Sequence, residues 1–148
     1  MTEVQFHFNV ADRLGYACRL LRKAYRLGTR VAVTGPLATL TRLDRALWTF
    51  DVLEFLPHVL VRAAEPLAPR LRDTPICLVE RAELATQHPV LVHLVEEPAE
   101  GFESFTRLIE IVSADPAERE TARVRWKYYA GRGYEIAKFG STASSGMS

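Results

Sequence analysis

The sequence predicts an α/β fold: a single domain with a mostly parallel, twisted sheet flanked by helices, of Rossmann-like topology but without a nucleotide site. Segments with the twofold period of a strand alternate with segments of helical period in the N-terminal part. Strands joined through helices pair in parallel. The 148 residues, 48% hydrophobic and 25% charged, fit one soluble domain. We expect that domain over residues 1–140 and a flexible, small and polar tail over 141–148.

The N-terminal half contains two predicted strand and helix pairs. Alternating apolar residues predict a strand over Val4–Val10, and the residues after it take helical spacing up to Gly28. The short β-branched segment 30–34 predicts a second strand, and Pro36 opens a second helix with leucines on its inner face: Leu40, Leu43 and Leu47. Residues 49–72 are interrupted by prolines and keep no sustained period, so we expect a loop with short elements there.

The C-terminal half contains the clearest boundary of the chain. Asp115 can cap a helix, Pro116 suits the first helical position, and Glu118 can close a capping box. That helix should end near Ala130, where glycines follow, and 134–139 predicts an edge strand. Three apolar segments before the helix predict further strands: 76–79, 90–95 and 105–112.

Composition excludes several classes of protein. The opening residues, MTEVQFHFNV, lack the basic start and apolar stretch of a signal peptide, and no apolar run reaches the length of a membrane span. We therefore expect a cytoplasmic protein with no membrane contact. Cys18 and Cys77 lie far apart without a CxxC spacing, which indicates buried free thiols.

No motif predicts catalysis, a metal or a cofactor. Val33-Thr34-Gly35-Pro36 forms a strand-to-helix turn, but it lacks the glycine patterns of nucleotide sites, and proline removes one amide. No two histidines have the spacing of metal ligands on a helix, and no GxSxG elbow occurs. The glutamates at 96, 97, 100 and 103 are most simply a solvated acidic loop, although paired carboxylates can do acid–base chemistry.

The helix from Arg119 to Tyr129 differs from the rest of the chain. Arg119, Arg123 and Trp126 are spaced so that they share one face. Further basic and aromatic residues widen this surface: Arg125, Lys127, Tyr128 and Tyr129. Guanidinium groups can hold carboxylates bidentately and an aromatic residue can wall an apolar pocket, which favours an acidic peptide with a hydrophobic end. From pattern alone, the alternative is an amphipathic helix with its aromatics in the core and its arginines in solvent.

Three segments in order carry a family resemblance: Arg42–Trp48 (RLDRALW), Phe55–His58 (FLPH), and Arg123–Tyr129 (RVRWKYY) followed by Gly133-Tyr134. Together they resemble the chi subunit of bacterial DNA polymerase III, and the likeness extends over nearly the whole chain. The resemblance implies a single α/β domain without catalytic activity or cofactor in the clamp-loader assembly. Such a subunit is an adaptor that links the psi subunit to the acidic, phenylalanine-terminated C-terminal tail of single-stranded DNA-binding protein, and so contacts DNA only indirectly.

The resemblance also implies two sets of site residues. The tail-binding positions fall on Arg119, Arg123 and Trp126, with Lys138 near the edge of the same site. The family commonly has lysine at the first of these positions and tyrosine at the third. A second surface falls on Trp48 and Phe55, which would contact psi or an XPD/DinG-like helicase. Read from the residues alone, an aromatic at a helix end and one in a proline-broken loop are more often core, although large aromatics are also preferred interface anchors, and it is the resemblance that favours an interface.

Two other functions remain open at this point. Basic residues interleaved with aromatics can bind single-stranded nucleic acid directly, because they track phosphates and stack on bases. A small nucleotide-dependent enzyme is the third hypothesis, and only the α/β pattern supports it.

Overall fold

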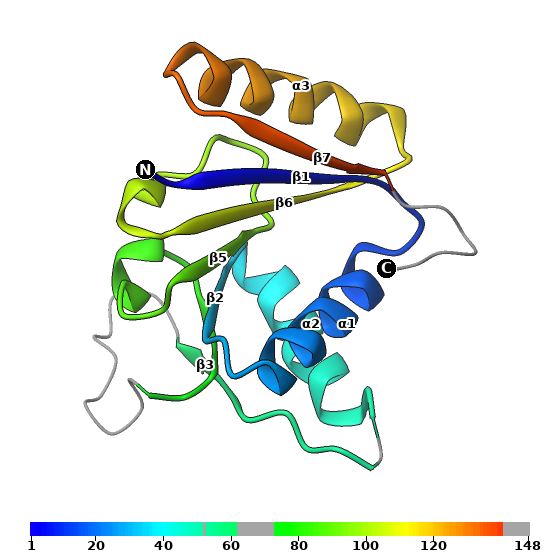
Figure 1. Cartoon of the computed structure of the whole chain (residues 1–148). Coiled ribbons are helices and arrows are strands. Elements are labelled where there is room, and N and C mark those ends of the chain that lie inside the picture. Colours follow the sequence, from blue (N-terminus) through cyan, green and yellow to red (C-terminus); the bar gives the residue numbers. More distant parts are fainter. Residues whose placement is uncertain (52, 62–72, 141–148) are drawn as a thin grey trace.

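A parallel sheet forms the centre of the computed structural model, which describes residues 1–51, 53–61 and 73–140 (Figure 1). Its seven strands lie in the order β3-β4-β2-β5-β6-β1-β7, and every neighbouring pair is parallel. The strands are β1 (Glu3–Val10), β2 (Val31–Thr34), β3 (His58–Val61), β4 (Ile76–Val79), β5 (Val90–His93), β6 (Arg107–Ser113) and β7 (Ile136–Gly140). The prediction of an α/β fold with a parallel sheet is confirmed.

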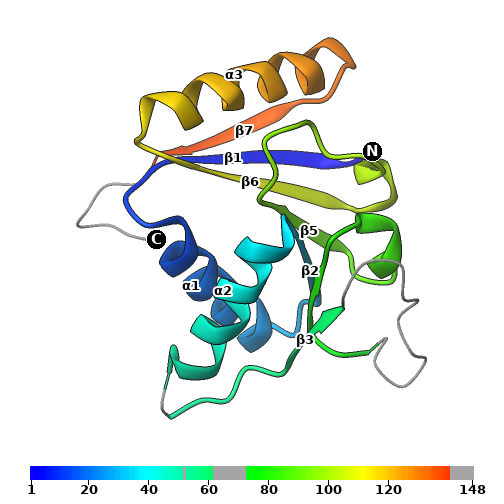
Figure 2. The same cartoon turned by 180° about the vertical axis from the view of Figure 1, so that it is seen from behind.

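Helices cover both faces of this sheet (Figure 2). α1 (Arg13–Arg26) and α2 (Leu37–Thr49) pack side by side on one face, and α3 (Pro116–Gly131) lies on the other, along β1 and β7. Within the described part of the chain, two short 3₁₀ turns also lie on the α3 side: η2 (Ala82–Ala85) and η3 (Phe102–Ser104). Within the described residues, no helix combines the length and apolar character needed to cross a bilayer.

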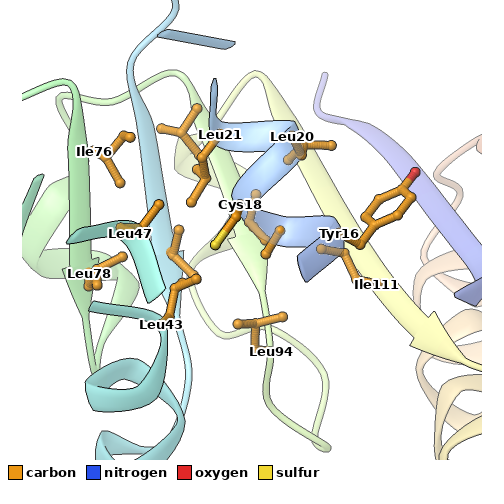
Figure 3. Packing of buried hydrophobic residues seen from close by; sticks show 14 of the residues in the cluster. Tyr16, Cys18, Leu20, Leu21, Leu43, Leu47, Ile76, Leu78, Leu94 and Ile111 are labelled. Atoms are coloured by element: carbon orange, nitrogen blue, oxygen red, sulfur yellow. The ribbon is translucent and has the colours of Figure 1, made fainter. Parts of the chain in front are cut away.

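The central strands bury both of their faces. In β2, Val31 and Val33 belong to the core under α1 and α2, whereas Ala32 between them belongs to the core on the α3 side. Figure 3 shows the first of these cores, in which Leu21 and Leu43 come from the two helices and pack above the sheet. Continuous apolar strands of this kind are expected where helices cover both faces.

A bulge in β1 changes the direction of its side chains. His7 is paired with Ile111 of β6, and Val10 is paired with Ser113. Between these two pairs, β1 contains one more residue than β6 does. Asn9 takes a positive φ of 61°, a conformation that asparagine tolerates better than most residues. As a result Val10 joins the core under α1 and α2, although Phe6 packs on the α3 side.

The segment from 49 to 72, where we expected a loop with short elements, agrees with that expectation in its described residues. It contains β3, a four-residue strand at the edge of the sheet. Pro57 stands immediately before it and further prolines follow at 66 and 69, so the sequence around β3 shows no sustained period. Residue 52, residues 62–72 and the predicted tail at 141–148 lie outside the described residues.

The start of α3 agrees with the sequence except for one contact. The Asp115 carboxylate caps the helix by accepting a hydrogen bond from the Glu118 amide at 3.1 Å. Glu118 does not close a box on Asp115, because its side chain accepts instead from the Ser113 amide at 3.4 Å. The Asp115 amide donates to the Ser113 hydroxyl, so the turn before the helix is held by its own side chain.

Candidate functional site

A pocket of about 460 Å³ opens between α3 and the edge of the sheet formed by β1, β6 and β7. We call it the α3 pocket, and it is lined by Phe6, Phe8, Val112, Arg119, Ala122, Arg123, Trp126 and Lys138. The four residues predicted to bind a peptide tail therefore line one hollow, although Lys138 comes from a different element. Their role in binding stays a prediction.

Aromatic rings form one side of the α3 pocket. The Trp126 ring is half-buried and packs against Phe6, with ring centroids 5.0 Å apart. The Lys138 ammonium lies 5.6 Å from the centroid of the Trp126 ring, within the range of a cation–π contact. Phe8 is 40% exposed, so an apolar group entering the pocket would find an accessible ring.

The rim of the α3 pocket is cationic. Among its eight described lining residues, Arg119, Arg123 and Lys138 are basic and none is acidic. All three side chains are exposed. Arg123 pairs with Glu120 at 3.2 Å, but both side chains are about two-thirds exposed, and such a pair contributes little. The Arg123 guanidinium therefore remains available to an anionic ligand.

Phe6 and Phe8 were not predicted as site residues. The alternation in β1 places them on one face of the strand, but the sequence does not say which helix covers that face. Only the parallel pairing of β1 with β6 and β7 brings them beneath Arg119 and Lys138.

Arg125 and Tyr129 do not widen the basic and aromatic surface, contrary to the expectation from the sequence. Both are buried, at 5% and 0% exposure, and both contact the fully buried Glu110 carboxylate. Arg125 Nε lies 3.1 Å from Glu110 Oε1, and the Tyr129 hydroxyl donates to Glu110 Oε2 at 2.7 Å. The sequence contained one indication of this network, the glutamate inside the apolar run LIEIV of β6. A buried carboxylate requires a partner, so this position predicts an inward-pointing donor on a neighbouring element.

This buried network fixes α3 on the sheet. Arg125 Nη1 also donates to the Glu96 carbonyl at 2.9 Å, and the Ala99 amide donates to the Tyr129 hydroxyl at 2.9 Å. Burial raises the pKa of the Tyr129 hydroxyl above its ordinary value, and the adjacent Glu110 charge raises it further. Tyr129 is thus a neutral donor. The network holds the helix so that Arg119, Arg123 and Trp126 face the pocket.

A second surface lies beyond α2, at the β3 edge. Trp48 at the end of α2 and Phe55 before β3 are 59% and 61% exposed, and their ring centroids are 5.4 Å apart. We call this pair the Trp48–Phe55 surface. His58 packs beneath Trp48, with ring centroids 4.8 Å apart, and its Nε2 lies 3.2 Å from Asp44 Oδ1.

The exposure of these two rings answers one question that the sequence left open. A core role would have buried them, whereas both remain largely accessible, and Leu53 beside them in the chain is 94% exposed. Adjacent large apolar side chains on a surface often mark an interaction site. Their contact with psi or a helicase stays a prediction.

The histidines and cysteines have structural environments. His7 bonds Tyr16 and Gln5, His88 bonds the Thr74 carbonyl, and His93 bonds Glu110. Cys18 and Cys77 are buried free thiols, as predicted, and burial raises the pKa of each to about 11. Across the described ranges, no group of three or more histidine, cysteine and carboxylate side chains could hold a metal ion.

Comparisons with known proteins identify the family. The family model described as "DNA polymerase III chi subunit, HolC" matches residues 1–137. The DNA polymerase III subunit chi of Pseudomonas aeruginosa is 32% identical over 143 residues, covering 92% of this chain and 94% of that protein. That of Haemophilus influenzae is 29% identical over 123 residues, covering 82% of each.

A solved structure of low sequence identity shares this fold. The C-terminal domain of S. cerevisiae Dbp5 superimposes with a TM-score of 0.63 at 12% identity, covering 95% of this chain and 90% of that one, which shows a shared fold and nothing of function. The sequence relatives carry the assignment. The chain belongs to the chi subunit family of DNA polymerase III, an accessory subunit of the replication machinery.

Proposed function

We propose that the chain is a non-catalytic adaptor of the clamp-loader assembly, which binds psi at one surface and the acidic tail of single-stranded DNA-binding protein at another. The observation that carries this proposal is the α3 pocket, where the exposed cations Arg119, Arg123 and Lys138 lie beside an aromatic wall. A chain end that is acidic and terminates in phenylalanine presents the matching chemistry.

The pocket suggests how such a tail would be held. Arg119 and Arg123 lie one helical turn apart on the exposed side of α3, so both guanidinium groups can reach carboxylates of one peptide. The terminal phenylalanine ring would pack against Trp126 and Phe8, an aromatic contact worth about 0.5–1.5 kcal/mol beyond burial. Lys138 closes the rim from β7 and adds a third positive charge.

The second surface supports the other half of the adaptor. The Trp48 and Phe55 rings together form an exposed apolar protrusion. Large aromatic side chains of this kind are frequent anchors of protein interfaces. Psi, or an XPD/DinG-like helicase, would cover them. Because the two surfaces lie at opposite edges of the sheet, both partners could bind at once.

Isothermal titration with an acidic, phenylalanine-terminated peptide tests the first surface. We expect Arg123→Ala to weaken binding about tenfold or more, since a charge-assisted hydrogen bond is lost. The matched control is Lys127→Ala, which removes an exposed charge from the same helix but does not line the pocket. Equal loss in both variants would indicate a diffuse charge effect, and unchanged binding by Arg123→Ala would refute the site.

Co-purification with psi tests the second surface. Phe55→Ala should release psi, whereas Val124→Ala should retain it, because Val124 is equally exposed but lies on α3. Retention of psi by Phe55→Ala and Trp48→Ala together would rule out this surface as the docking site.

Direct binding of single-stranded DNA is the second candidate, and the accessible rings of Phe8 and Tyr128 beside several cations favour it. An oligonucleotide of mixed sequence, added to the protein without peptide, distinguishes the two functions. Micromolar, strongly salt-sensitive binding that Lys127→Ala weakens as much as Arg123→Ala would favour direct DNA binding.

A further inference from the structure

A second pocket, of about 350 Å³, opens at the carboxyl ends of β2, β4 and β5, on the same side of the sheet as α3. We call it the β2–β5 pocket. Its floor contains Thr34, Leu91 and His93, and its walls come from the start of η2 and from the loop before η3. Its volume lies within the range of small-molecule sites, and neither proposed docking surface uses it.

The floor contains a polar group without a partner. Thr34 is 3% exposed, and its Oγ1 has no hydrogen-bond partner in the part of the chain that the structure describes. A buried hydroxyl in this state costs free energy, so such groups normally bond a ligand, a water or another side chain. Because Thr34 lines the pocket, whatever occupies the pocket can supply that bond.

His93 adds a second polar group beside Thr34. The two residues are register partners in neighbouring parallel strands, so their side chains stand on the same face of the sheet. His93 Nδ1 lies 2.9 Å from the Glu110 carboxylate, which can only accept, so Nδ1 carries the proton. In the neutral imidazole Nε2 is then an acceptor. The floor therefore offers the Thr34 hydroxyl oxygen to a ligand that donates, and the neutral form of His93 adds a second acceptor.

The walls of the β2–β5 pocket are acidic. Among the described residues, four glutamates and one arginine line it: Glu80, Glu83, Glu97, Glu100 and Arg81. Arg81 is paired with Glu83, and Glu97 and Glu100 provide the charges of the rim. Glu97 and Glu100 are exposed and lie on the same loop. This field is opposite in sign to that of the α3 pocket.

The geometry points to a binding site for an organic cation, an alkylammonium group that donates to the acceptors of the floor while the glutamates neutralise its charge. An ammonium has three donors and no acceptor, which fits a floor of acceptors below a rim of carboxylates. Leu91, Val95 and Pro98 would contact the methylenes of the ligand. A free polyamine and a lysine side chain of a polypeptide share this chemistry.

Titration of the full chain with n-butylammonium, followed by amide chemical shifts in NMR, tests the site. We expect saturable shifts confined to the amides around Thr34, His93 and Glu97, and none with 1-butanol, which has the same shape without the charge. Thr34→Val should weaken binding about tenfold and raise the melting temperature, because it removes the unpartnered hydroxyl. The control Thr41→Val changes a threonine of α2 that bonds Leu37 and should bind as the wild type does.

Three results would overturn the proposal: butanol binding as well as the ammonium, Thr34→Val binding unchanged, or no saturable shift with any cation, in which case only water satisfies Thr34. Glu97→Gln combined with Glu100→Gln gives a second measurement should Thr34→Val fold poorly, and this pair should also weaken binding. Spermidine and N-acetyl-lysine methylamide then distinguish the two sources, since the natural ligand class should saturate at the lower concentration.

Discussion

The α3 pocket and the Trp48–Phe55 surface expose aromatic rings at opposite edges of one sheet, in different surroundings. Trp126 is half-buried at the wall of a hollow with a cationic rim, whereas Trp48 and Phe55 project beyond the end of α2. A hollow with charged walls suits the end of a peptide chain, and a projecting apolar pair suits a groove in a folded partner. The same residue types therefore predict different partners according to local shape and charge.

The two edges also differ in what lies beneath them. α2 packs on the sheet through leucines, among them Leu43 and Leu47, in an apolar core. α3 packs through Ala122 and Tyr129, and where a further apolar side chain would be expected it places Arg125 on a buried carboxylate. The position of α3 on the sheet thus depends on the hydrogen bonds of a buried polar network. The position of α2 depends on how well its apolar side chains fill the core.

The largest effect should come from breaking that network. Arg125→Met leaves the Glu110 charge buried beside Tyr129 and His93 without its cation, which should lower the free energy of unfolding by about 3–5 kcal/mol. Urea unfolding followed by circular dichroism measures this loss. The double variant Arg125→Met with Glu110→Gln should recover much of it, because no charge is left unpaired. A loss below about 1 kcal/mol in the single variant would mean that the network does not hold α3.

Acid should weaken the β7 edge of the sheet next, from the face that α1 covers, where His7 bonds Tyr16. Burial, with a smaller contribution from Arg107, lowers the pKa of His7 in β1 from 6.5 to about 4. The unfolded chain therefore binds a proton between these values that the folded chain does not. The resulting stability is complete above pH 6.5 and is lost as the pH falls toward about 4, by up to about 3 kcal/mol.

Unfolding measured across this pH range tests the role of His7. His7→Gln should show a flatter pH dependence than the wild type. The His7 ring packs against Phe139 of β7, with centroids 4.8 Å apart, so amide exchange in β7 should rise before exchange in β3. An unchanged slope in His7→Gln would assign the effect to other groups, among them His88, whose pKa burial also lowers.

Exchanging tryptophan for alanine at each surface should separate the two partners. Trp126→Ala should cost about 2 kcal/mol of affinity for the acidic peptide and leave psi binding unchanged, and Trp48→Ala should do the reverse. Trp48→Ala should also unfold at nearly the wild-type denaturant concentration, because its ring is 59% exposed. Loss of both partners in either variant would show that the two surfaces are coupled.

Salt should give the smallest difference. Raising sodium chloride from about 50 to about 500 mM should weaken peptide binding several-fold at the α3 pocket, because its rim carries three exposed cations. Binding of psi to the apolar Trp48–Phe55 surface should change far less. Titrations of both partners at the two salt concentrations measure the contrast, and equal sensitivity would contradict the assignment of charge to one edge only.

The spacing of apolar residues predicted most of the helices and strands, because these residues recur on the buried face or faces of each element. The capping residue Asp115 marked the start of α3, and the helical spacing of Arg119, Arg123 and Trp126 placed them on one face correctly. The strand β3 was not placed individually within the segment expected to hold short elements, because prolines at 57, 66 and 69 interrupt that segment and its apolar residues keep no sustained period.

Side-chain direction was harder to predict where a charged residue points inward. Arg125 belongs to the buried face of α3, and only the position of Glu110 on the neighbouring strand explains why. Lys138 was predicted as a site residue from the family resemblance alone. The helical spacing that grouped the other three residues does not extend to a residue of β7. The β2–β5 pocket could not be predicted either, because Thr34 and His93 are far apart in the sequence and become neighbours only through strand pairing.

The bulge at Asn9 places the side chains of Phe8 and Val10, two positions apart in β1, on opposite faces of the sheet. Phe8 lines the α3 pocket, while Val10 fills the core on the opposite face. Without the extra residue, regular alternation would turn both side chains to the same face. Because of it, a substitution at position 8 would reshape the α3 pocket without altering the hydrophobic core beneath α1, so the shape of this edge and the stability of that core can vary independently.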